Sequence, residues 1–225
     1  MNIKLNIVQP PLVFFLIPSN GCSAEFFDCF FDLVSYCYRV GINFRVIRKY
    51  SSVVYFARNL CLEGEVRRGV NQKPFNGRYN YTHLMWLDDD IAFKPEQFHS
   101  LLDLNLDIVS GIYKMAGGKY YATVKEWDEK YYQKTGAFKF LTDEDIKNHH
   151  RLMDVAYTGF GFMLIRRGVF ESLPYPWFRP IFYEIGNCVD FCAEDVGFCK
   201  SIQARGYKIY VDPKIRVRHI KRVLL

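Results

Sequence analysis

Three consecutive aspartates, Asp88, Asp89 and Asp90, directly follow an apolar run over residues 84–87. Their carboxylates would repel one another unless a positive charge lay between them, and a divalent cation is the simplest source of that charge. In an extended segment alternate side chains point the same way, so we expect Asp88 and Asp90 to face one ligand while Asp89 turns aside. Hard oxygen donors of this kind suit Mg²⁺ or Mn²⁺, which bind carboxylates together with phosphate oxygens. The acidic run therefore predicts a metal site.

The alternative explanation of these aspartates is that they cap the next segment or lie in solvent, as runs of charged residues usually do. The surrounding sequence favours the metal site. Four apolar or aromatic residues precede the aspartates and Ile91, Ala92 and Phe93 follow them, so the carboxylates are attached to a rigid, buried frame. We expect that frame to be a strand of an open α/β sheet, and ligands collect at the carboxyl ends of such strands.

Two other places carry ionisable side chains suited to chemistry. Glu194 and Asp195 are adjacent at the start of a predicted helix, where the helix dipole keeps carboxylates ionised. Such residues commonly cap a helix, and one of the two can instead act as a general base that accepts a proton from a hydroxyl. His219 follows the last predicted strand and is a second candidate metal ligand, although a lone histidine is more often structural or exposed.

Arg58 and Asn59 lie near the start of a predicted helix over residues 53–70. Their side chains can donate hydrogen bonds to a nucleobase, a ribose or a diphosphate. The alternative is an ordinary helix surface, and the two residues by themselves leave both interpretations open.

The hydrophobic pattern predicts an α/β fold. Residues 13–17 form a continuous apolar run, typical of a strand buried on both faces, and bulky residues recur at helical spacing between Ser23 and Gly41. A strand over 43–47 completes a strand, helix, strand unit, which is typical of a parallel sheet flanked by helices. The other predicted elements are strands over 83–87, 107–111, 162–165 and 208–211 and helices over 95–104, 167–173 and 194–205. Residues 113–150 show no clear pattern.

Composition limits the class of protein. The chain has 225 residues, 50% of them hydrophobic, which suits one large α/β domain and argues against disorder. Its net charge of +6 includes a late group of basic residues, which we interpret as a solvated surface that also steers an anionic small molecule. Nucleic acid or an anionic membrane is the alternative partner of such a patch. The basic residues are Arg205, Lys208, Lys214, Arg216, Arg218, Lys221 and Arg222.

The cysteines and the hydropathy indicate in which cellular compartment the protein works. Seven cysteines, an odd number without regular spacing, argue against a disulfide framework and for a reducing compartment. Cys188, Cys192 and Cys199 contain no C-x-x-C pair, so buried thiols are favoured over a zinc site. The apolar run over 12–17 is too short to span a membrane. We therefore predict a soluble, cytoplasmic protein with no transmembrane segment.

The candidate residues belong to an ordered set of segments that covers most of the chain. The segments are 16–19, 57–59, 86–91, 159–167, 194–199, 212–213 and His219. In this order they resemble the GT-A glycosyltransferases, a family with a nucleotide-binding, Rossmann-like sheet and a D-x-D metal motif. D-x-D alone is a weak motif, whereas the ordered set is far more specific. In size and layout the resemblance extends to small viral glycosyltransferase domains and, more distantly, to Anp1-type mannosyltransferases.

The resemblance implies a single GT-A domain over residues 1–225, an α/β fold with a mostly parallel central sheet flanked by helices. Residues 1–110 would form the nucleotide-binding half and residues 111–225 the acceptor-binding half. The implied activity is that of a hexosyltransferase-type enzyme, which moves a sugar from a UDP- or GDP-sugar to a hydroxyl of a glycan or glycoprotein. It would be inverting and depend on Mn²⁺ or Mg²⁺. For a viral protein, the implied location is the host cytoplasm.

Carried over residue by residue, the resemblance also implies roles for the candidate side chains. Asp90 and His219 would ligate the metal, and Asp88 would contact the ribose or a metal-bound water or join the ligands. Asp195 would be the general base, and Glu194 can exchange roles with it. Because the three aspartates are consecutive, Asp89 could take the role of one of its neighbours, Asp88 or Asp90. The residues implied in nucleotide binding are Pro18, Ser19, Arg58, Asn59, Asp88 and Asp89.

Three other functions are compatible with parts of this pattern. Sugar nucleotidyltransferases share this type of sheet, but no Gly-rich, Arg-containing loop of the kind that holds a triphosphate follows the first predicted strand. A non-catalytic carbohydrate- or metal-binding protein would keep the aspartates without a usable base. A nucleic-acid-binding module would use the late basic residues, and its affinity would depend strongly on salt. We expect a nucleotide-sugar donor and no nucleic acid.

Overall fold

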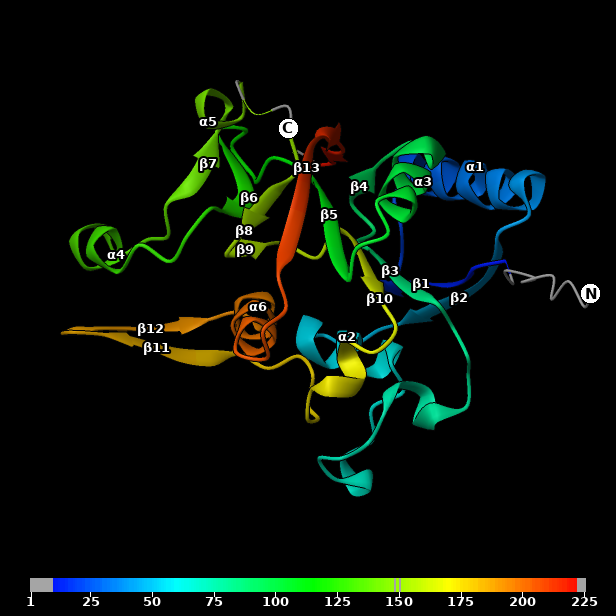
Figure 1. The fold of residues 1–225 in the computed structure, drawn as a ribbon, viewed down its shortest axis with the longest axis horizontal. Coiled ribbons are helices and arrows are strands. Elements are labelled where there is room, and N and C mark those ends of the chain that lie inside the picture. Colours follow the sequence, from blue (N-terminus) through cyan, green and yellow to red (C-terminus); the bar gives the residue numbers. More distant parts are fainter. Residues whose placement is uncertain (1–9, 148, 150, 222–225) are drawn as a thin grey trace, which may run out of the picture.

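A seven-stranded sheet forms the centre of the protein (Figure 1). The computed structural model describes residues 10–147, 149 and 151–221, so Arg222 of the basic group lies outside the described residues. In spatial order the strands are β2 (Asn43–Lys49), β1 (Leu12–Pro18), β3 (His83–Leu87), β10 (Phe162–Arg166), β5 (Ile108–Ile112), β13 (Ile209–Arg216) and β8 (Met153–Val155). Five strands run in one direction, whereas β10 and β8 run in the other. The predicted mostly parallel sheet is confirmed.

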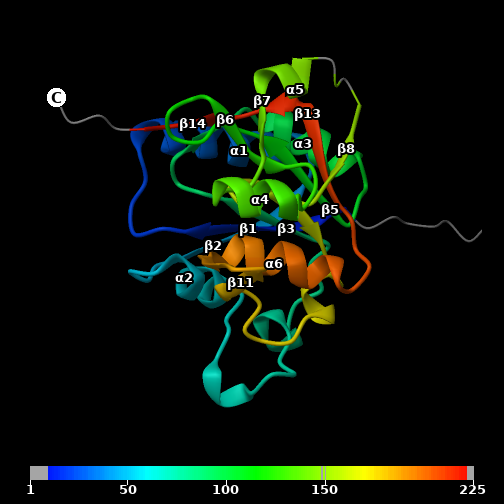
Figure 2. The same cartoon turned by 90° about the vertical axis from the view of Figure 1, so that its left-hand side faces the viewer.

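Helices cover both faces of this sheet, which gives three layers (Figure 2). Along β1, Val13 and Phe15 face a core that includes residues of α1 and α3, whereas Phe14 and Leu16 face a core that includes residues of α2 and α6. This alternation explains the continuous apolar run in the sequence, because a strand with helices on both sides buries every side chain. The six α-helices of the described residues are α1 (Ala24–Val40), α2 (Val54–Cys61), α3 (Pro95–Asp103), α4 (Glu129–Thr135), α5 (Asp143–Lys147) and α6 (Glu194–Gln203).

The ends of α1 follow the capping rules that the sequence suggested. The Ser23 side chain accepts a hydrogen bond from the backbone N–H of Phe26 at 3.0 Å. The helix ends at Gly41, whose φ of 75° belongs to the left-handed region that glycine adopts without strain. Among the described residues, no helix combines the length and the hydropathy that a membrane span requires.

Two predicted helices are wrong in length. The helix expected over 53–70 ends at Cys61, and a short 3-10 helix, η1 (Val66–Arg68), follows it. Here the carbonyl of Asn59 accepts hydrogen bonds from the N–H groups of Leu62 and Gly64, and a Cβ at Gly64 would lie 2.6 Å from the Tyr175 ring. This close packing bends the chain out of the helix. The helix expected over 167–173 is only the 3-10 turn η3 (Phe170–Ser172).

Short strands occupy the regions between the main elements. A three-stranded sheet contains β7 (Phe140–Thr142), β6 (Tyr120–Val124) and β9 (Tyr157–Thr158), so part of the unassigned region 113–150 is a sheet. The hairpin of β11 (Ile181–Ile185) and β12 (Cys188–Cys192) projects beside α6 (Figure 1). The remaining two-stranded sheet pairs β4 (Ile91–Ala92) with β14 (Arg218–His219), and η2 (Pro74–Gly77) lies before β3.

Strands from both halves of the chain alternate within the main sheet. β10 lies between β3 and β5, and β13 lies beside β5, so residues 1–110 and 111–225 are not separate structural units. A single domain over the described residues follows from this arrangement. It also brings residues of both halves to the carboxyl end of β3, where the three aspartates lie.

Candidate active site

The three aspartates form a turn and not an extended segment. The N–H of Ile91 donates to the carbonyl of Asp88 at 3.1 Å, and the N–H of Asp88 donates to the carbonyl of Gly161 at 3.1 Å. In a turn, side chains do not alternate as they do in a strand, so the expectation that Asp88 and Asp90 share a face is not met. Each of the three carboxylates has its own set of partners.

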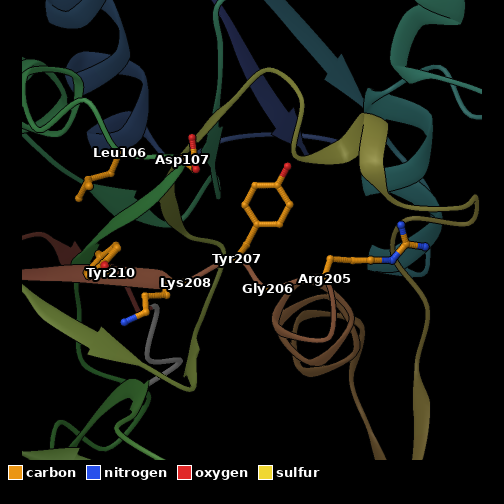
Figure 3. Close-up of a pocket in the computed structure, with 7 residues that line it drawn as sticks. All are labelled: Leu106, Asp107, Arg205, Gly206, Tyr207, Lys208 and Tyr210. Carbon is orange, nitrogen blue, oxygen red and sulfur yellow. The ribbon is translucent and has the colours of Figure 1, made fainter.

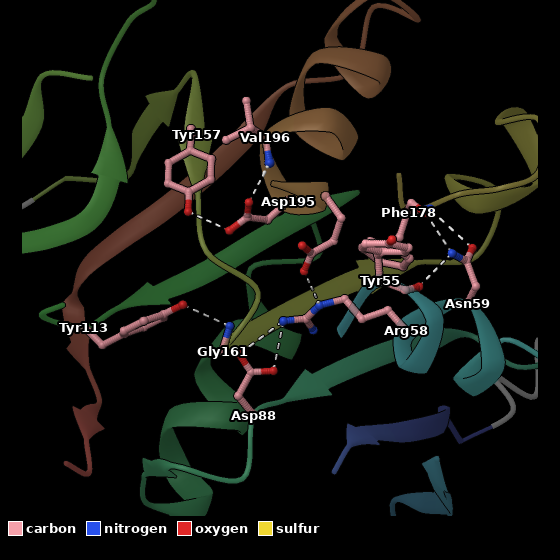
Figure 4. A network of polar contacts seen from close by, with 11 residues as sticks. Tyr55, Arg58, Asn59, Asp88, Tyr113, Tyr157, Gly161, Phe178, Asp195 and Val196 are labelled. Carbon is pink, nitrogen blue, oxygen red and sulfur yellow. Dashed lines mark hydrogen bonds and ion pairs between the residues drawn. The ribbon is translucent and has the colours of Figure 1, made fainter. Parts of the chain in front are cut away.

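Asp88 is bound by the buried guanidinium of Arg58. The Arg58 Nη2 atom lies 3.0 and 3.2 Å from the two carboxylate oxygens of Asp88, and its Nε lies 3.1 Å from Oε1 of Glu194 (Figure 4). The guanidinium also packs on aromatic rings, with its carbon 5.1 Å from the ring centre of Phe160. Arg58 is only 4% exposed. One guanidinium therefore connects the turn after β3 to the first residue of α6.

Burial and neighbouring charges shift the pKa values of Arg58, Asp88 and Glu194 in opposite directions. Burial lowers the pKa of Arg58, but the carboxylates of Asp88, Glu194 and Asp195 outweigh burial and hold the pKa above its ordinary value. Burial raises the pKa of both Asp88 and Glu194, and the Arg58 charge opposes that rise. The two acidic side chains depend on Arg58 to stay ionised. The arginine is thus a positioning residue. Of its guanidinium nitrogens, Nη1 is buried and has no hydrogen-bond partner among the described residues.

Asp90 meets His219, which the resemblance implied as a metal ligand. The two are 129 positions apart in sequence, and their Oδ2 and Nε2 atoms lie 2.8 Å apart. Pairing of β14 with β4 sets His219 opposite Ile91, and the N–H of Ile220 donates to the carbonyl of Asp90. The sheet register therefore brings the pair together.

The hydrogen bond of the other ring nitrogen of His219 determines which tautomer the ring presents to Asp90. Nδ1 lies 3.1 Å from the carbonyl oxygen of Lys114, which can only accept, so Nδ1 carries the hydrogen. In the neutral ring the Nε2 lone pair then points at a carboxylate oxygen. A protonated ring or a cation between the two removes that conflict, and a histidine that donates Nδ1–H to a carbonyl has the arrangement of a metal ligand. The residues present therefore fit a divalent cation.

The protein offers this cation two side chains. Over the described ranges, no group of three or more His, Cys, Asp or Glu residues could hold a metal. Asp88, an expected ligand, is held by Arg58 and does not complete such a group with Asp90 and His219. Mg²⁺ and Mn²⁺ often bind through one or two protein ligands and take the rest from phosphate and water. The pair is thus suited to a cation that arrives with a phosphate-bearing ligand.

Asp89 and Ser19 line one side of the same region. The Ser19 hydroxyl contacts Oδ2 of Asp89, and the N–H of Ser19 donates to the carbonyl of Lys49. Ser19 is buried, and Pro18 ends β1 just before it. Beside them a groove of about 420 Å³ is lined by Asn20, Gly21, Cys22, Ser23, Asp89, Asp90, Ile220 and Lys221. The loop after β1 and the acidic turn therefore border one groove.

Asn59 does not fit the expected contact with a nucleotide. Its amide nitrogen donates to the carbonyls of Tyr55 and Phe178 at 2.8 and 2.7 Å. Its carbonyl oxygen accepts from the N–H groups of Trp177 and Phe178 at 3.1 and 3.3 Å. The side chain is buried and its hydrogen-bonding capacity is used inside the protein. Asn59 fixes the 177–178 segment against α2, next to the Arg58 guanidinium (Figure 4).

Asp195 and Glu194 have different environments. Glu194 is 5% exposed and held by Arg58, whereas Asp195 is half-buried. Asp195 accepts hydrogen bonds from the Tyr157 hydroxyl at 2.7 Å and from the Val196 N–H at 2.8 Å (Figure 4). Each carboxylate oxygen still has a further lone pair for a proton donor. Of the adjacent acids, Asp195 is the one that solvent and a substrate can reach.

The sequence did not predict the contacts that Tyr113, Tyr157 and Lys221 make at the site. The Tyr113 hydroxyl accepts from the N–H of Gly161 at 3.1 Å, and a Cβ at Gly159 would lie 2.2 Å from that hydroxyl. Closely spaced glycines are a signal of such close approach. Burial raises the pKa of both tyrosines, so they act here as neutral hydroxyls. For Lys221, the signal was its position two residues after His219, on the same side of an extended segment.

A second groove lies at the opposite end of the sheet. It has a volume of about 410 Å³ and is bordered by residues just before β5 and at the start of β13. Figure 3 shows Arg205 and Lys208 pointing away from each other there. Arg205 contacts the Ser172 carbonyl, and Lys208 pairs with Asp154. The charges in this groove do not converge on a common point, so the groove at the aspartates is the stronger candidate site.

Known structures share this fold. A197 from STIV matches 96% of this chain and 98% of its own chain, with a TM-score of 0.54 and 17% sequence identity. GalNAc-T7, solved with UDP, GalNAc and Mn²⁺, matches 95% of this chain and 43% of its own, with a TM-score of 0.56 and 12% identity. The protein has the GT-A fold. No family model matches the sequence, and no curated protein is significantly similar to it. At these identities the likeness establishes the GT-A fold, and the activity has to be argued from the site.

Replacing Arg58 by Ala should destabilise the protein by about 3–5 kcal/mol, because it leaves two buried carboxylates without their counter-charge. Urea unfolding followed by circular dichroism measures this loss. The loss should shrink as the pH falls, because protonation of Asp88 and Glu194 removes the uncompensated charges. Arg78→Ala is the control, since Arg78 pairs with Glu63 at an exposed position, and it should cost less than about 1 kcal/mol. Equal losses in the two variants would contradict the role given to Arg58.

Replacing Gly159 by Ala should cost about 1–3 kcal/mol, because the added methyl group overlaps the buried Tyr113 hydroxyl. Adding Tyr113→Phe to that variant should recover part of the loss, although Tyr113→Phe alone also destabilises by leaving the Gly161 N–H unpaired. Gly21→Ala is the control, because no atom lies within 4 Å of a Cβ there. Unfolding free energies of the single and double variants form a cycle. Strictly additive losses would show that the two side chains do not collide.

Proposed function

We propose that the protein is a glycosyltransferase that moves a sugar from a nucleotide-diphosphate donor to a hydroxyl of a glycan or glycoprotein acceptor. The observation that carries this proposal is the convergence of Asp90 and His219 at the carboxyl end of β3 on a GT-A fold. The presence of UDP and Mn²⁺ with GalNAc-T7 supports a nucleotide donor and a divalent cation for this chain as well. UDP- and GDP-sugars are both compatible with the site.

Asp90 and His219 would hold Mn²⁺ or Mg²⁺ against the diphosphate of the donor. When bound, the cation supplies positive charge where negative charge develops on the leaving diphosphate. The groove beside Ser19 and Asp89 would take the nucleotide part. In this assignment residues 1–110 supply most of the donor site, and residues 111–225 supply His219 and the acceptor side.

Asp195 is the residue we assign as general base. Tyr157 and the Val196 N–H fix its carboxylate in the first turn of α6. It would take the proton of the acceptor hydroxyl while that oxygen attacks the anomeric carbon from the side opposite the nucleotide. A single displacement of this kind inverts the anomeric centre. Glu194 is less suited to the role because Arg58 holds it inside the protein.

The seven cysteines support work in a reducing compartment, because all are free thiols. We therefore extend the proposal to a cytoplasmic enzyme.

Calorimetric titration of UDP and GDP, with and without Mn²⁺, tests the donor site. We expect one nucleotide to bind only when Mn²⁺ is present. Asp90→Ala and His219→Ala should each weaken that binding by about 10-fold to 100-fold or more, since even outer-shell partners of metal ligands have effects of this size. Asp154→Ala, at an exposed salt bridge with Lys208, should leave it unchanged. If neither nucleotide binds under any condition, the proposed function loses its basis.

Alkylation of Cys22 gives an independent test that does not need turnover. Cys22 is exposed and lines the proposed nucleotide groove, whereas burial raises the pKa of the Cys37 and Cys61 thiols to about 11 and about 12. N-ethylmaleimide should therefore modify Cys22 early, and the bound nucleotide with Mn²⁺ should slow this reaction severalfold. Mass spectrometry of the peptides follows it, with Cys188 on β12 as the internal control. Unchanged labelling of Cys22 at nucleotide saturation would place the nucleotide elsewhere.

A further inference from the structure

Two nitrogen atoms share one carboxylate oxygen at the proposed metal site. Oδ2 of Asp90 lies 2.8 Å from Nε2 of His219 and also 3.1 Å from Nζ of Lys221. His219 ends β14 and Lys221 lies two residues later, and both side chains reach the same carboxylate oxygen. The Lys221 ammonium thus carries a full positive charge directly at the oxygen that would bind a divalent cation.

A divalent cation and this ammonium exclude each other at Asp90. A cation bound to Oδ2 would lie close to the ammonium, and two like charges at such a distance repel strongly. The ion pair between Lys221 and Asp90 is partly exposed, with 47% and 37% of the two side chains accessible. Exposed pairs of this kind contribute little, so a cation with two ligands can displace the lysine.

We propose that Lys221 is an internal competitor for the metal site. Without a divalent cation, its ammonium neutralises Asp90 and holds the carboxylate beside His219. When a cation binds, Lys221 leaves Asp90 and its charge stays in the wall of the groove that contains Asn20, Cys22 and Asp89, where it faces an anionic ligand. This inference rests on the proposed function, because it assumes that Asp90 and His219 bind a divalent cation.

The competition assigns Lys221 a definite effect on metal affinity. Because the lysine must be displaced first, the intrinsic affinity of the Asp90 and His219 pair is higher than the affinity of the intact protein. Removing the ammonium should therefore tighten metal binding. A residue that only stabilised the end of β14 would have the opposite effect, because its loss would loosen His219.

Mn²⁺ binding to the nucleotide-free protein, followed by electron paramagnetic resonance of the free ion, tests the proposal. Lys221→Gln should bind Mn²⁺ about two- to fivefold more tightly than the wild type, the range set by the usual strength of an exposed ion pair. Lys221→Arg keeps the charge and should resemble the wild type. Lys214→Gln removes the same charge from an exposed position of β13 and should also resemble the wild type.

The outcomes separate this proposal from the proposed function. If the wild type binds Mn²⁺ and Asp90→Ala does not, an unchanged or weaker affinity of Lys221→Gln overturns the competition alone. If the wild type binds no Mn²⁺ in the absence of nucleotide, the competition is overturned, because Lys221 then has no cation to compete with. The proposed function is judged separately, by the binding of nucleotide together with Mn²⁺.

A second measurement uses the wild-type side chain. After reductive ¹³C-methylation, which preserves the charge of lysines, the Lys221 signal is identified as the one missing from Lys221→Gln. Diamagnetic Mg²⁺ should shift that signal in step with saturation of the site, whereas the Lys214 signal should stay constant. A Lys221 signal that does not move at saturating Mg²⁺ would show that the lysine never leaves Asp90 and would overturn the proposal.

Discussion

The buried guanidinium of Arg58 is the interaction on which the site depends. It holds Asp88 in the turn after β3 and Glu194 at the start of α6, two places that the sheet alone would not connect. An arginine can do this because its planar group donates in several directions at once and stays charged inside an aromatic environment. Lysine, with one compact ammonium group, does not offer the same geometry. The positions of Asp90 on one side and Asp195 on the other follow from the two carboxylates that Arg58 fixes.

Other contacts complete the site from distant parts of the chain. Asn59 uses its whole amide to fix the backbone at Trp177 and Phe178, and Phe178 in turn lies against the guanidinium of Arg58. Pairing of β14 with β4 brings His219 to Asp90. These contacts are polar and largely buried, so each unmet partner would be costly. The site is therefore a rigid frame at its centre, with a more exposed edge at the groove.

The sequence predicted the strands that are buried on both faces and the helices whose apolar residues recur at helical spacing. The continuous apolar runs of β1, β3 and β10 and the capped, amphipathic α1 are examples. It could not predict the β11–β12 hairpin, because Phe182, Val189 and Phe191 point to solvent and hide the alternation expected of a half-buried strand. It overextended α2, because the end of that helix is set by packing of Gly64 against Tyr175, a contact between residues far apart in sequence.

The same distinction applies to the site. Residue types at a strand end predicted where a site would lie, and the resemblance implied roles for particular residues there. The partner of each aspartate could not be inferred, because it depends on a turn in place of an extended segment and on an arginine from α2. Asn59 appeared equivalent to Arg58 in sequence, yet their helix presents one to the carboxylates and the other to a backbone segment. Only the packing of α2 separates the two roles.

The order of the strands in the central sheet also has a consequence for how the chain folds. β3 pairs with β10 and β5 pairs with β13, so strands formed early in synthesis find partners that emerge much later. Until residue 166 is available, β3 and β5 have no strand between them, and the apolar edges of both remain open. Such long-range pairing slows folding and leaves strand edges exposed to other chains for longer. His219 follows β13, the last of the seven strands in sequence, so His219 meets Asp90 only when the sheet is complete.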